Sequence, residues 1–381
     1  MDLRLKLVTT SLDVKGGANR VILKMAQQFR APIYCLEYKA EKNFDEFSDF
    51  EIITPKTDYI SKLANRNQAV NTLNACNYFK KLKFGENDIV SAHLPPSNWT
   101  ANLNRTIWYV HSLHPPWAFE LYEWKLNKMN SMARPFFKLW TRKFRKNEIE
   151  NAAKSRHIFT NSRYMERKIK DEYGLNSEIL YPGINSGDFR CRDYEKFFFY
   201  PSRFSPEKNF EYVVDAFGKF SLKNKGWKLI LAGSTSDFPE HEAYLRKIKT
   251  MQNDSISIEI NLSEERLREL YSHCYAVLYP PLNEPYGLVP LEALASSKPV
   301  IARNEGGPRE TVSDGVDGFL VDSPAEMAEK MEWLAQNPDA CEKMGRAGKE
   351  KVNKYFTWDY FLKRFEEKAV EVGNEGNAHS P

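Results

Sequence analysis

Short apolar runs of strand length alternate with segments of helical periodicity along almost the whole chain. Strands are expected over residues 3–9, 32–37, 88–92, 106–111 and 156–160, and again over 197–201, 228–232, 255–260, 276–279 and 300–303. Helices are expected between them, over 18–29, 60–81, 134–154, 209–223, 264–272 and 290–296. Because a strand–helix–strand connection brings the chain back in the same direction, this order predicts an α/β fold with parallel sheets.

The alternation pauses at a turn-rich stretch, residues 181–188, and then restarts. A chain of 381 residues is long enough for two domains of similar size. We therefore expect a first Rossmann-like domain over 1–185, a second over 186–356 and a flexible tail over 373–381. Ligands of open parallel sheets bind at the carboxyl ends of the strands, so the chemistry is expected in the loops that face a central cleft.

The two halves of the chain differ in charge. Residues 1–185 hold 29 Lys and Arg against 19 Asp and Glu, whereas residues 186–381 hold 26 against 32. The basic first half indicates an anionic partner, such as a membrane surface or a nucleic acid. The five cysteines contain no C-x-x-C pair, which indicates reduced thiols in a cytoplasmic protein. No signal peptide and no run of about 18 apolar residues is seen, so any membrane contact should be peripheral.

The densest motif is the segment 279–292, YPPLNEPYGLVPLE, which follows an expected strand. Pro290 suits the first turn of a helix, where its missing N–H is not needed. The loop should therefore deliver free backbone N–H groups at a helix N-terminus, and such groups bind anions. They would come from Tyr286, Gly287, Leu288 and Val289, and Gly287 would let a phosphate approach closely.

Two glutamates, Glu284 and Glu292, flank this expected anion site. Their carboxylates could accept hydrogen bonds from sugar hydroxyls. The alternative is that both acids only stabilise the positive end of the helix dipole.

A second cationic motif, residues 201–209 (PSRFSPEKN), follows the first strand of the second domain. Arg203 and Lys208 flank a turn and could converge on one diphosphate, the first as a fork and the second as a point charge. The alternative is a solvated charged turn.

Two further positions follow strands of the first domain. Gly16 and Gly17 open the first helix and would admit a ligand close to the backbone, although the loop is not the G-x-G-x-x-G pattern of a dinucleotide site. His111 stands at the carboxyl end of the expected strand 106–111 and should face the cleft. The alternatives are an ordinary tight turn and a structural histidine.

Together these segments resemble the retaining glycosyltransferases of family 4, which have the two-domain GT-B fold. The stretch from Glu284 to Glu292 resembles the family's E-x7-E motif, and the segments 305–310 and 315–320 resemble those that follow it. The sequence departs from the family where Pro285-Tyr286 replaces Gly-Phe and where Ser202 replaces a glycine. The resemblance also implies that a final helix, 357–372, with Thr357 as its N-cap, crosses back to pack on the first domain.

The resemblance assigns roles to individual residues. It implies that Glu284 contacts the hydroxyls of the donor sugar and that Glu292 contacts the ribose. It implies that Arg203 and Lys208 hold the donor diphosphate. The remaining matches place Gly17 against the phosphates and His111 beside the donor sugar.

Retention is then expected to follow the family's front-face route, in which the departing phosphate helps to deprotonate the acceptor and Glu284 positions the sugar. Because the sequence contains no Asp-x-Asp motif, the cations and the helix N-terminus should stabilise the leaving diphosphate, and no metal or other cofactor is expected. The segment 109–117 resembles part of the bacterial mannosyltransferases, which favours GDP-mannose over a UDP-sugar as the donor.

The acceptor has to be inferred from residues 117–146, which interleave eight aromatic residues with eight Lys and Arg. Aromatics on one side of a helix and cations on the other would fit the surface of an anionic bilayer. A core-facing aromatic stripe with a solvated basic face is the alternative. The family's many lipid-linked acceptors favour a glycan or lipid-linked acceptor and a peripheral position at the cytoplasmic face of a membrane, and no nucleic acid is expected.

Three other functions remain open. One is another GT-B enzyme, such as a nucleotide-sugar epimerase or a synthase with a soluble acceptor. An oxidoreductase is disfavoured because the first strand is not followed by a dinucleotide motif. A non-catalytic scaffold is disfavoured because Arg203, Lys208, Glu284 and Glu292 are all present.

Overall fold

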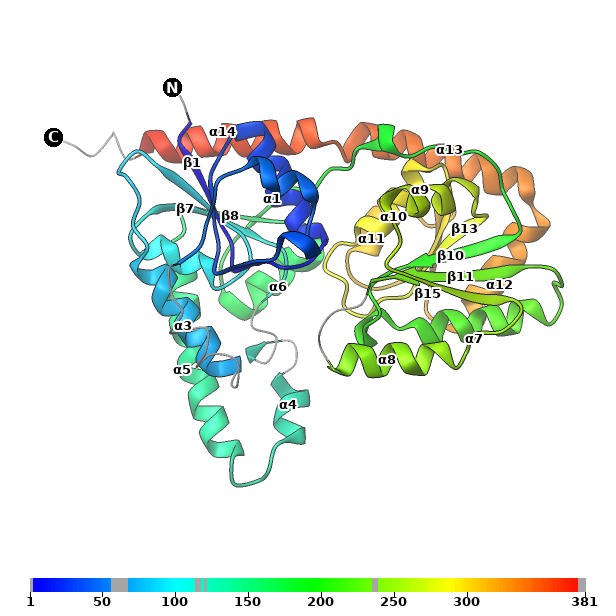
Figure 1. Ribbon diagram of the computed structural model, residues 1–381, viewed down its shortest axis with the longest axis horizontal. Helices are drawn as coiled ribbons and strands as arrows, with labels where there is room; N and C mark the ends of the chain where they lie inside the picture. The colour runs from blue at the N-terminus through cyan, green and yellow to red at the C-terminus, as the bar shows by residue number, and fades with distance from the viewer. Residues whose placement is uncertain (1–2, 56–67, 114–117, 120–121, 235–238, 376–381) are drawn as a thin grey trace. The chain divides into compact units, whose positions relative to one another are not determined.

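The computed structural model describes residues 3–55, 68–113, 118–119, 122–234 and 239–375 (Figure 1). The chain folds into two compact units, which are Met1–Tyr181 with Phe361–Pro381 (the first unit) and Pro182–Tyr360 (the second unit). The change of unit after Tyr181 lies in the turn-rich stretch around which the sequence predicted a boundary. Both units are α/β, as predicted.

The first unit is built on a parallel sheet of seven strands in the order β5-β3-β1-β6-β7-β8-β9. The strands are β1 (Leu5–Val8), β3 (Ile33–Tyr34), β5 (Ile52–Ile53), β6 (Ile89–Ala92), β7 (Arg105–Val110), β8 (His157–Thr160) and β9 (Glu178–Ile179). A separate parallel pair joins β2 (Ser11–Leu12) and β4 (Glu37–Tyr38). The sheet order reverses between β1 and β6, which makes the loops after these two strands the expected ligand-binding point.

The helices of the first unit connect these strands. They are α1 (Gly17–Phe29), α3 (Gln68–Lys81), α4 (Tyr122–Lys128), α5 (Arg134–Ala152) and α6 (Arg163–Tyr173), with short 3-10 helices η1 (Ala40–Lys42), η2 (Asp45–Asp49) and η3 (Ser97–Asn102). Residues 60–67 of the helix expected over 60–81 lie outside the described residues. Figure 1 shows α4 and the beginning of α5 extending away from the sheet of this unit.

The second unit contains a six-stranded parallel sheet in the order β12-β11-β10-β13-β14-β15. Its strands are β10 (Phe197–Pro201), β11 (Lys228–Gly233), β12 (Ile256–Ile260), β13 (Ala276–Tyr279), β14 (Val300–Arg303) and β15 (Gly318–Val321). Its helices are α7 (Phe210–Ser221), α8 (Pro239–Lys249), α9 (Glu264–His273), α10 (Leu288–Ala295), α11 (Pro308–Thr311), α12 (Pro324–Gln336) and α13 (Pro338–Tyr355), with η5 (Ser186–Asp188) and η6 (Pro206–Lys208). Here the order reverses between β10 and β13.

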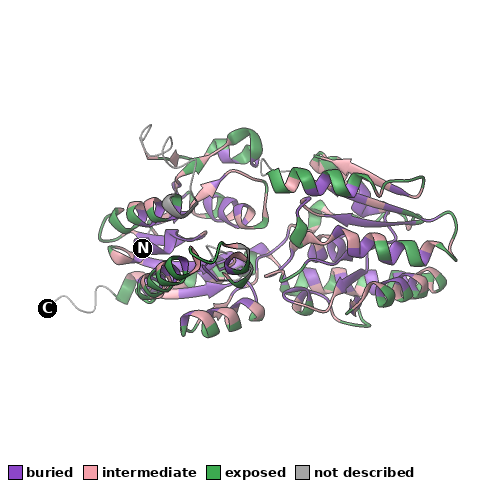
Figure 2. Cartoon of the chain, turned by 90° about the horizontal axis from the view of Figure 1, so that it is seen from below, coloured by how far each residue is buried: buried purple, intermediate pink, exposed green. Residues whose placement is uncertain are grey.

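The sheets form the cores of both units. Every residue of β6, β10 and β13 is buried, because helices cover both faces of a parallel sheet. Figure 2 shows the strands in the colour of buried residues and the outer helix faces as exposed.

The last helix, α14 (Trp358–Glu375), begins in the second unit and continues into the first. The backbone N–H of Tyr360 donates to Thr357 Oγ1 at 3.3 Å, which confirms the predicted N-cap. Phe361 and Phe365 are fully buried and pack against Tyr109 and Phe159 of the first unit, with ring centroids 5.5 and 6.0 Å apart. The helix extends to Glu375, beyond residue 373 where a tail was expected. None of the described helices is long and apolar enough to cross a membrane.

Candidate functional site

The loop after β10 carries the two cations predicted to bind a diphosphate. The backbone continues beside β11, since Ser202 N–H donates to Ala232 O at 2.8 Å and Phe204 N–H donates to Ser234 O at 3.0 Å. A Cβ at Gly233 would lie 1.7 Å from Ser202 O, so this close approach requires glycine there. The loop that carries the cations is thus held against the neighbouring strand.

Lys208 is paired with the predicted sugar-binding carboxylate. It ends η6, and its Nζ donates to Glu284 Oε2 at 2.5 Å. The two side chains are only 18% and 13% exposed, so the pair is largely withdrawn from water. The backbone at Lys208 is fixed as well, because the Tyr200 hydroxyl donates to Lys208 O at 2.5 Å. The loops after β10 and β13 therefore meet at the reversal of the sheet order, where ligands of such sheets bind.

Arg203 has an unused donor. Its Nη2 lies 3.5 Å from Glu207 Oε1, an ion pair within the same loop. Its Nε is enclosed and has no hydrogen-bond partner among the described residues. An enclosed N–H without a partner costs free energy, which an anionic ligand at this position would recover.

The loop from β13 to α10 is shaped by three glycines. Gly287 adopts a left-handed φ of 86°, and a Cβ there would meet the Tyr279 ring. Gly306 has a φ of 66°, and its Cβ would lie 2.3 Å from Glu284 O. Gly307 donates its N–H to the same carbonyl at 2.8 Å. The segment 305–310, noted in the sequence, thus packs its glycines against the backbone of Glu284 and fixes it.

The anion site predicted at the N-terminus of α10 depends on backbone N–H groups alone. Gly287 is the N-cap residue and no side chain caps the helix, which leaves the first backbone N–H groups free of side-chain capping. The side chains of Leu288 and Val289 are half-buried. Tyr286 is buried, and its hydroxyl donates to Pro182 O at 2.9 Å, so only its backbone can serve a ligand.

Glu292, the second predicted carboxylate, lies on α10. Its Oε2 accepts a hydrogen bond from the Tyr271 hydroxyl at 2.7 Å. Burial, with the neighbouring Glu292 carboxylate, raises the pKa of Tyr271 well above its ordinary value, so the tyrosine remains a donor. Burial, followed by the Glu284 charge, likewise raises the pKa of Tyr279, and Glu292 contributes less. Tyr279 therefore lies close to both carboxylates that the sequence singled out.

In the first unit, His111 directly follows β7 and is 8% exposed. Burial lowers its pKa to about 3, so the ring is neutral at pH 7. Its Nε2 lies 3.1 Å from Nδ1 of His93, which follows β6 and was not singled out from the sequence. The rule that selected His111, a polar residue at the carboxyl end of a strand, would also have selected His93.

The loop after β1 does not need a glycine at position 16 for steric reasons. Gly16 is the N-cap residue of α1 with an extended φ of −149°, and a Cβ there would have room, with Val14 Cγ1 at 3.9 Å. Gly17 is the first residue of α1. Asn19 organises the loop instead, since its Nδ2 donates to Val14 O at 2.8 Å. The fold itself therefore does not require glycine at position 16. A glycine there leaves room for a ligand to approach the backbone.

The aromatic residues of 117–146 divide into two groups. Phe119, Phe137 and Phe144 are buried in the core of the first unit. Phe136 is 77% exposed, and so are its apolar neighbours Met132 (80%) and Leu139 (71%). Most of the described rings thus face the core, and a separate apolar stripe faces solvent. Trp117 lies outside the described residues.

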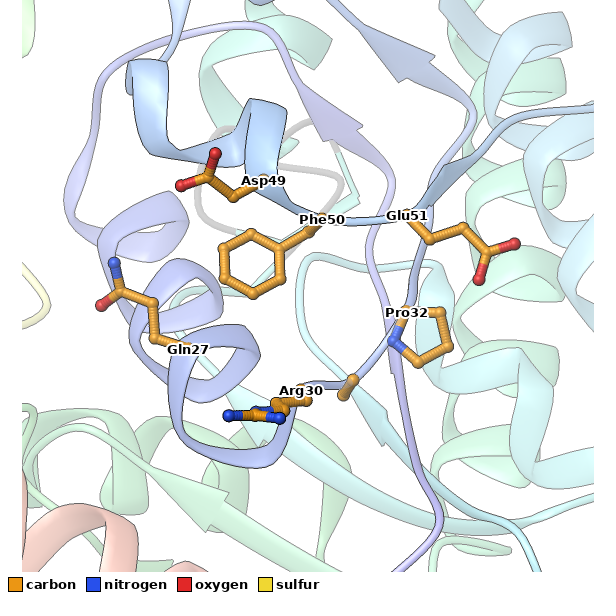
Figure 3. A pocket seen from close by; sticks show the side chains of 7 residues that line it. Gln27, Arg30, Pro32, Asp49, Phe50 and Glu51 are labelled. Atoms are coloured by element: carbon orange, nitrogen blue, oxygen red, sulfur yellow. The ribbon is translucent and has the colours of Figure 1, made fainter.

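One hollow of about 420 Å³ lies elsewhere in the first unit, lined by the end of α1 and the residues before β3 and β5 (Figure 3). Gln27 lies on α1 and Arg30 directly follows it, and Asp49, Phe50 and Glu51 precede β5. It opens at the amino ends of the strands, away from the edge where ligands of such sheets bind, and is not the candidate site. The described residues contain no cluster of three or more His, Cys, Asp or Glu arranged to hold a metal ion.

Comparison with known proteins agrees with this architecture. Residues 15–187 match the family Glycosyltransferase Family 4, and residues 186–351 match Glycosyl transferases group 1. The structure of Anabaena HepE in complex with UDP-glucose superposes with a TM-score of 0.76 at 15% identity, covering 96% of this chain and 99% of that one. The fold is therefore GT-B. The chain belongs to the family 4 type of glycosyltransferases.

Two curated relatives illustrate the range of the family. The alpha-1,3/1,6-mannosyltransferase ALG2 of Mus musculus is 28% identical over 304 residues, covering 72% of this chain and 70% of the relative. The trehalose synthase of Pyrococcus horikoshii is 32% identical over 170 residues, covering 43% of this chain and 41% of the relative. The chain spans about half of the ALG2 proteins of Dictyostelium discoideum (52%) and Homo sapiens (56%).

Proposed function

We propose that the protein is a retaining hexosyltransferase that moves a sugar from a nucleoside diphosphate sugar to a glycan or lipid-linked acceptor. Two observations carry the proposal: the Lys208–Glu284 pair, and Arg203 on the same loop as Lys208, whose Nε has no partner among the described residues. The loops that carry these two cations and this carboxylate follow β10 and β13, the two strands at the sheet reversal. A diphosphate would satisfy the cations, and a sugar hydroxyl would satisfy the carboxylate.

In this proposal the second unit binds the donor. Arg203 and Lys208, with the backbone N–H groups at the start of α10, stabilise negative charge as it develops on the leaving diphosphate. These groups replace a divalent ion. Glu284 orients the sugar, and Glu292, held by Tyr271, accepts from the ribose. Because the role of Glu284 is to position the donor sugar, its loss slows transfer mainly by misorienting that sugar.

GDP-mannose is the donor that we favour, and a UDP-sugar is the alternative. The mannosyltransferase name of the mouse relative supports mannose. The HepE complex with UDP-glucose shares only the fold, and the trehalose synthase similarity keeps a soluble sugar acceptor as the second candidate function.

The first experiment is a calorimetric titration of GDP, UDP and ADP in EDTA into the wild type and the Arg203→Ala/Lys208→Ala variant. We expect one diphosphate to bind without metal and the variant to lose at least about tenfold in affinity, as for charge-assisted contacts. The control is Lys219→Ala/Arg246→Ala, which removes two other cations, both exposed, from the same unit. Equal binding by wild type and double variant would refute the site. Anomeric analysis of the product by NMR tests retention.

The partner surface belongs to the same proposal. Phe136 and Leu139 are three residues apart near the start of α5 and so share one face, and the exposed Met132 lies in the turn just before the helix. Lys138, Arg142 and Lys143 beside them are exposed and form no ion pair with any described residue. An apolar stripe edged by cations fits an anionic bilayer, where a lipid-linked acceptor would reside.

A further inference from the structure

Three polar side chains form a hydrogen-bonded chain at the carboxyl edge of the first unit's sheet. Ser91 Oγ lies 3.1 Å from His93 Nε2, and His93 Nδ1 lies 3.1 Å from His111 Nε2. Ser91 and His93 are fully buried, and His111 keeps 8% of its surface exposed. The chain therefore runs from the interior to one partly accessible imidazole.

The sheet register produces this alignment. Ser91 lies on β6 and His93 follows two residues later, so both side chains lie on the same side of the strand. β7 is the parallel neighbour of β6, with Ala92 opposite Trp108. His111 follows β7, and its carbonyl accepts from Asn161 Nδ2 at 2.9 Å, which fixes the backbone that carries the ring.

Both rings are neutral. Burial lowers the pKa of His111 to about 3, and burial together with the neighbouring His111 lowers the pKa of His93 well below its ordinary value. Two neutral imidazoles share a single N–H in the bond between them. The chain therefore has only two directions, one with Ser91 as the donor and one with Ser91 as the acceptor.

The Ser91 hydroxyl selects between these directions. If it accepted from His93, its own proton would need another acceptor, and the described residues offer none. A buried O–H without an acceptor is costly, whereas donation to His93 Nε2 leaves no unpaired donor. His93 Nδ1–H then donates to His111 Nε2, and the proton of His111 must sit on Nδ1. No described residue makes a hydrogen bond to that atom.

We infer that Ser91 and His93 are positioning residues that hold His111 as a neutral hydrogen-bond donor through Nδ1–H. The inference rests on the proposed function, in which His111 contacts the donor substrate. The ligand atom that it meets is an acceptor, either a hydroxyl oxygen of the sugar or a phosphate oxygen. His111 does not serve as a general base, because its only unprotonated nitrogen is occupied by His93.

The test reads the tautomers directly. Full-length protein labelled with 15N in the imidazole rings of its seven histidines is studied by long-range proton–nitrogen correlation NMR, without ligand, between pH 5.5 and 8. We expect His111 and His93 to carry the proton on Nδ1 throughout, with no titration. A proton on His111 Nε2, or a ring that becomes charged in this range, overturns the inference.

Matched variants separate positioning from packing. Ser91→Ala should allow the reversed tautomers at both histidines and lower kcat about threefold or more, with KM within about twofold. Ser91→Thr, which keeps the hydroxyl, should retain the wild-type tautomers. Ser97→Ala is the control, because Ser97 is a fully buried serine of the same unit whose hydroxyl has no partner among the described residues. Unchanged tautomers in Ser91→Ala would refute the role of Ser91.

Failure of this inference differs from failure of the proposed function. If no nucleoside diphosphate binds and no sugar is transferred, the proposed function is wrong whatever the tautomers are. If a nucleoside diphosphate sugar is bound and used while His111 carries its proton on Nε2, only the positioning by Ser91 and His93 is wrong.

Discussion

Lys208 and Glu284, 76 positions apart in the sequence, form an ion pair in which Nζ and Oε2 are 2.5 Å apart. Each of these side chains is proposed to bind a different part of the donor substrate. In this structure they satisfy one another, and under the proposed function donor binding would exchange this contact for contacts with diphosphate and sugar. The proposed function thus predicts that the pair couples the diphosphate and sugar ends of the donor site.

Lys208→Met should destabilise the second unit by about 1–3 kcal/mol, because it leaves a largely buried carboxylate without its partner. Lys208→Met/Glu284→Gln should recover part of this loss, since no charge is then unpaired. Glu284→Gln alone should keep diphosphate affinity but lower kcat about a hundredfold through misorientation of the sugar. Urea unfolding, calorimetry and steady-state kinetics measure the three effects. A double variant as unstable as Lys208→Met would contradict the pairing.

Gly306→Ala should be far more harmful than Gly315→Ala. Both glycines have left-handed φ values, 66° and 74°, so both substitutions carry a similar backbone strain of roughly 1 kcal/mol. A Cβ at Gly306 would also lie 2.3 Å from Glu284 O, whereas the space around Gly315 is open. We expect Gly306→Ala to cost at least about 2 kcal/mol more and to abolish donor binding. Equal stability of the two variants would show that the loops do not depend on this contact.

Glu148 should make stability fall as pH rises. It is fully buried on α5, where it accepts hydrogen bonds from Asn98, Trp99 and Tyr173. Burial outweighs these bonds and raises its pKa from 4.5 to about 7. The folded state then holds the proton more tightly than the unfolded state, so the contribution of Glu148 is complete below pH 4.5 and is lost as pH rises toward 7.

The size of that loss is on the order of 3 kcal/mol. Glu148→Gln, which cannot ionise, should lack this slope. The difference in unfolding free energy between wild type and variant, measured from pH 5 to 8 by urea titration, should therefore change in favour of the variant as pH rises. A pH-independent difference would show that Glu148 is not protonated in the folded state.

Met132→Ser/Phe136→Ser/Leu139→Ser should lower binding to vesicles rich in anionic lipid by about tenfold or more, because three exposed apolar side chains no longer insert. The midpoint of thermal unfolding should hardly change, since these side chains are exposed. Leu222→Ser is the control, being 73% exposed on the second unit. Flotation with neutral and anionic vesicles measures the effect, and equal flotation of wild type and triple variant would exclude this stripe.

Local patterns were sufficient for the fold class and for most of the strands. The apolar runs over 197–201, 276–279 and 300–303 are strands at those bounds, because a strand buried on both faces is apolar throughout and can be read from composition. Two-residue strands such as β5 and β9 were not predicted, since so short a run carries no periodicity. The helices α6, α8, α12 and α13 were also not predicted, although α6 begins at a serine N-cap that the sequence displays.

The sequence by itself determined which residues could carry the chemistry, because cations, carboxylates and glycines after strands are recognisable wherever the sheet places them. Only the tertiary structure decided their partners. Three contacts depend on loops that meet at the sheet reversal. These are the ion pair of Lys208 with Glu284, the hydrogen bond from Tyr286 to Pro182 O and the close approach of Gly306 to Glu284 O. The pairing of Ser91, His93 and His111 depends likewise on the register of β6 and β7, a long-range property that no local pattern records.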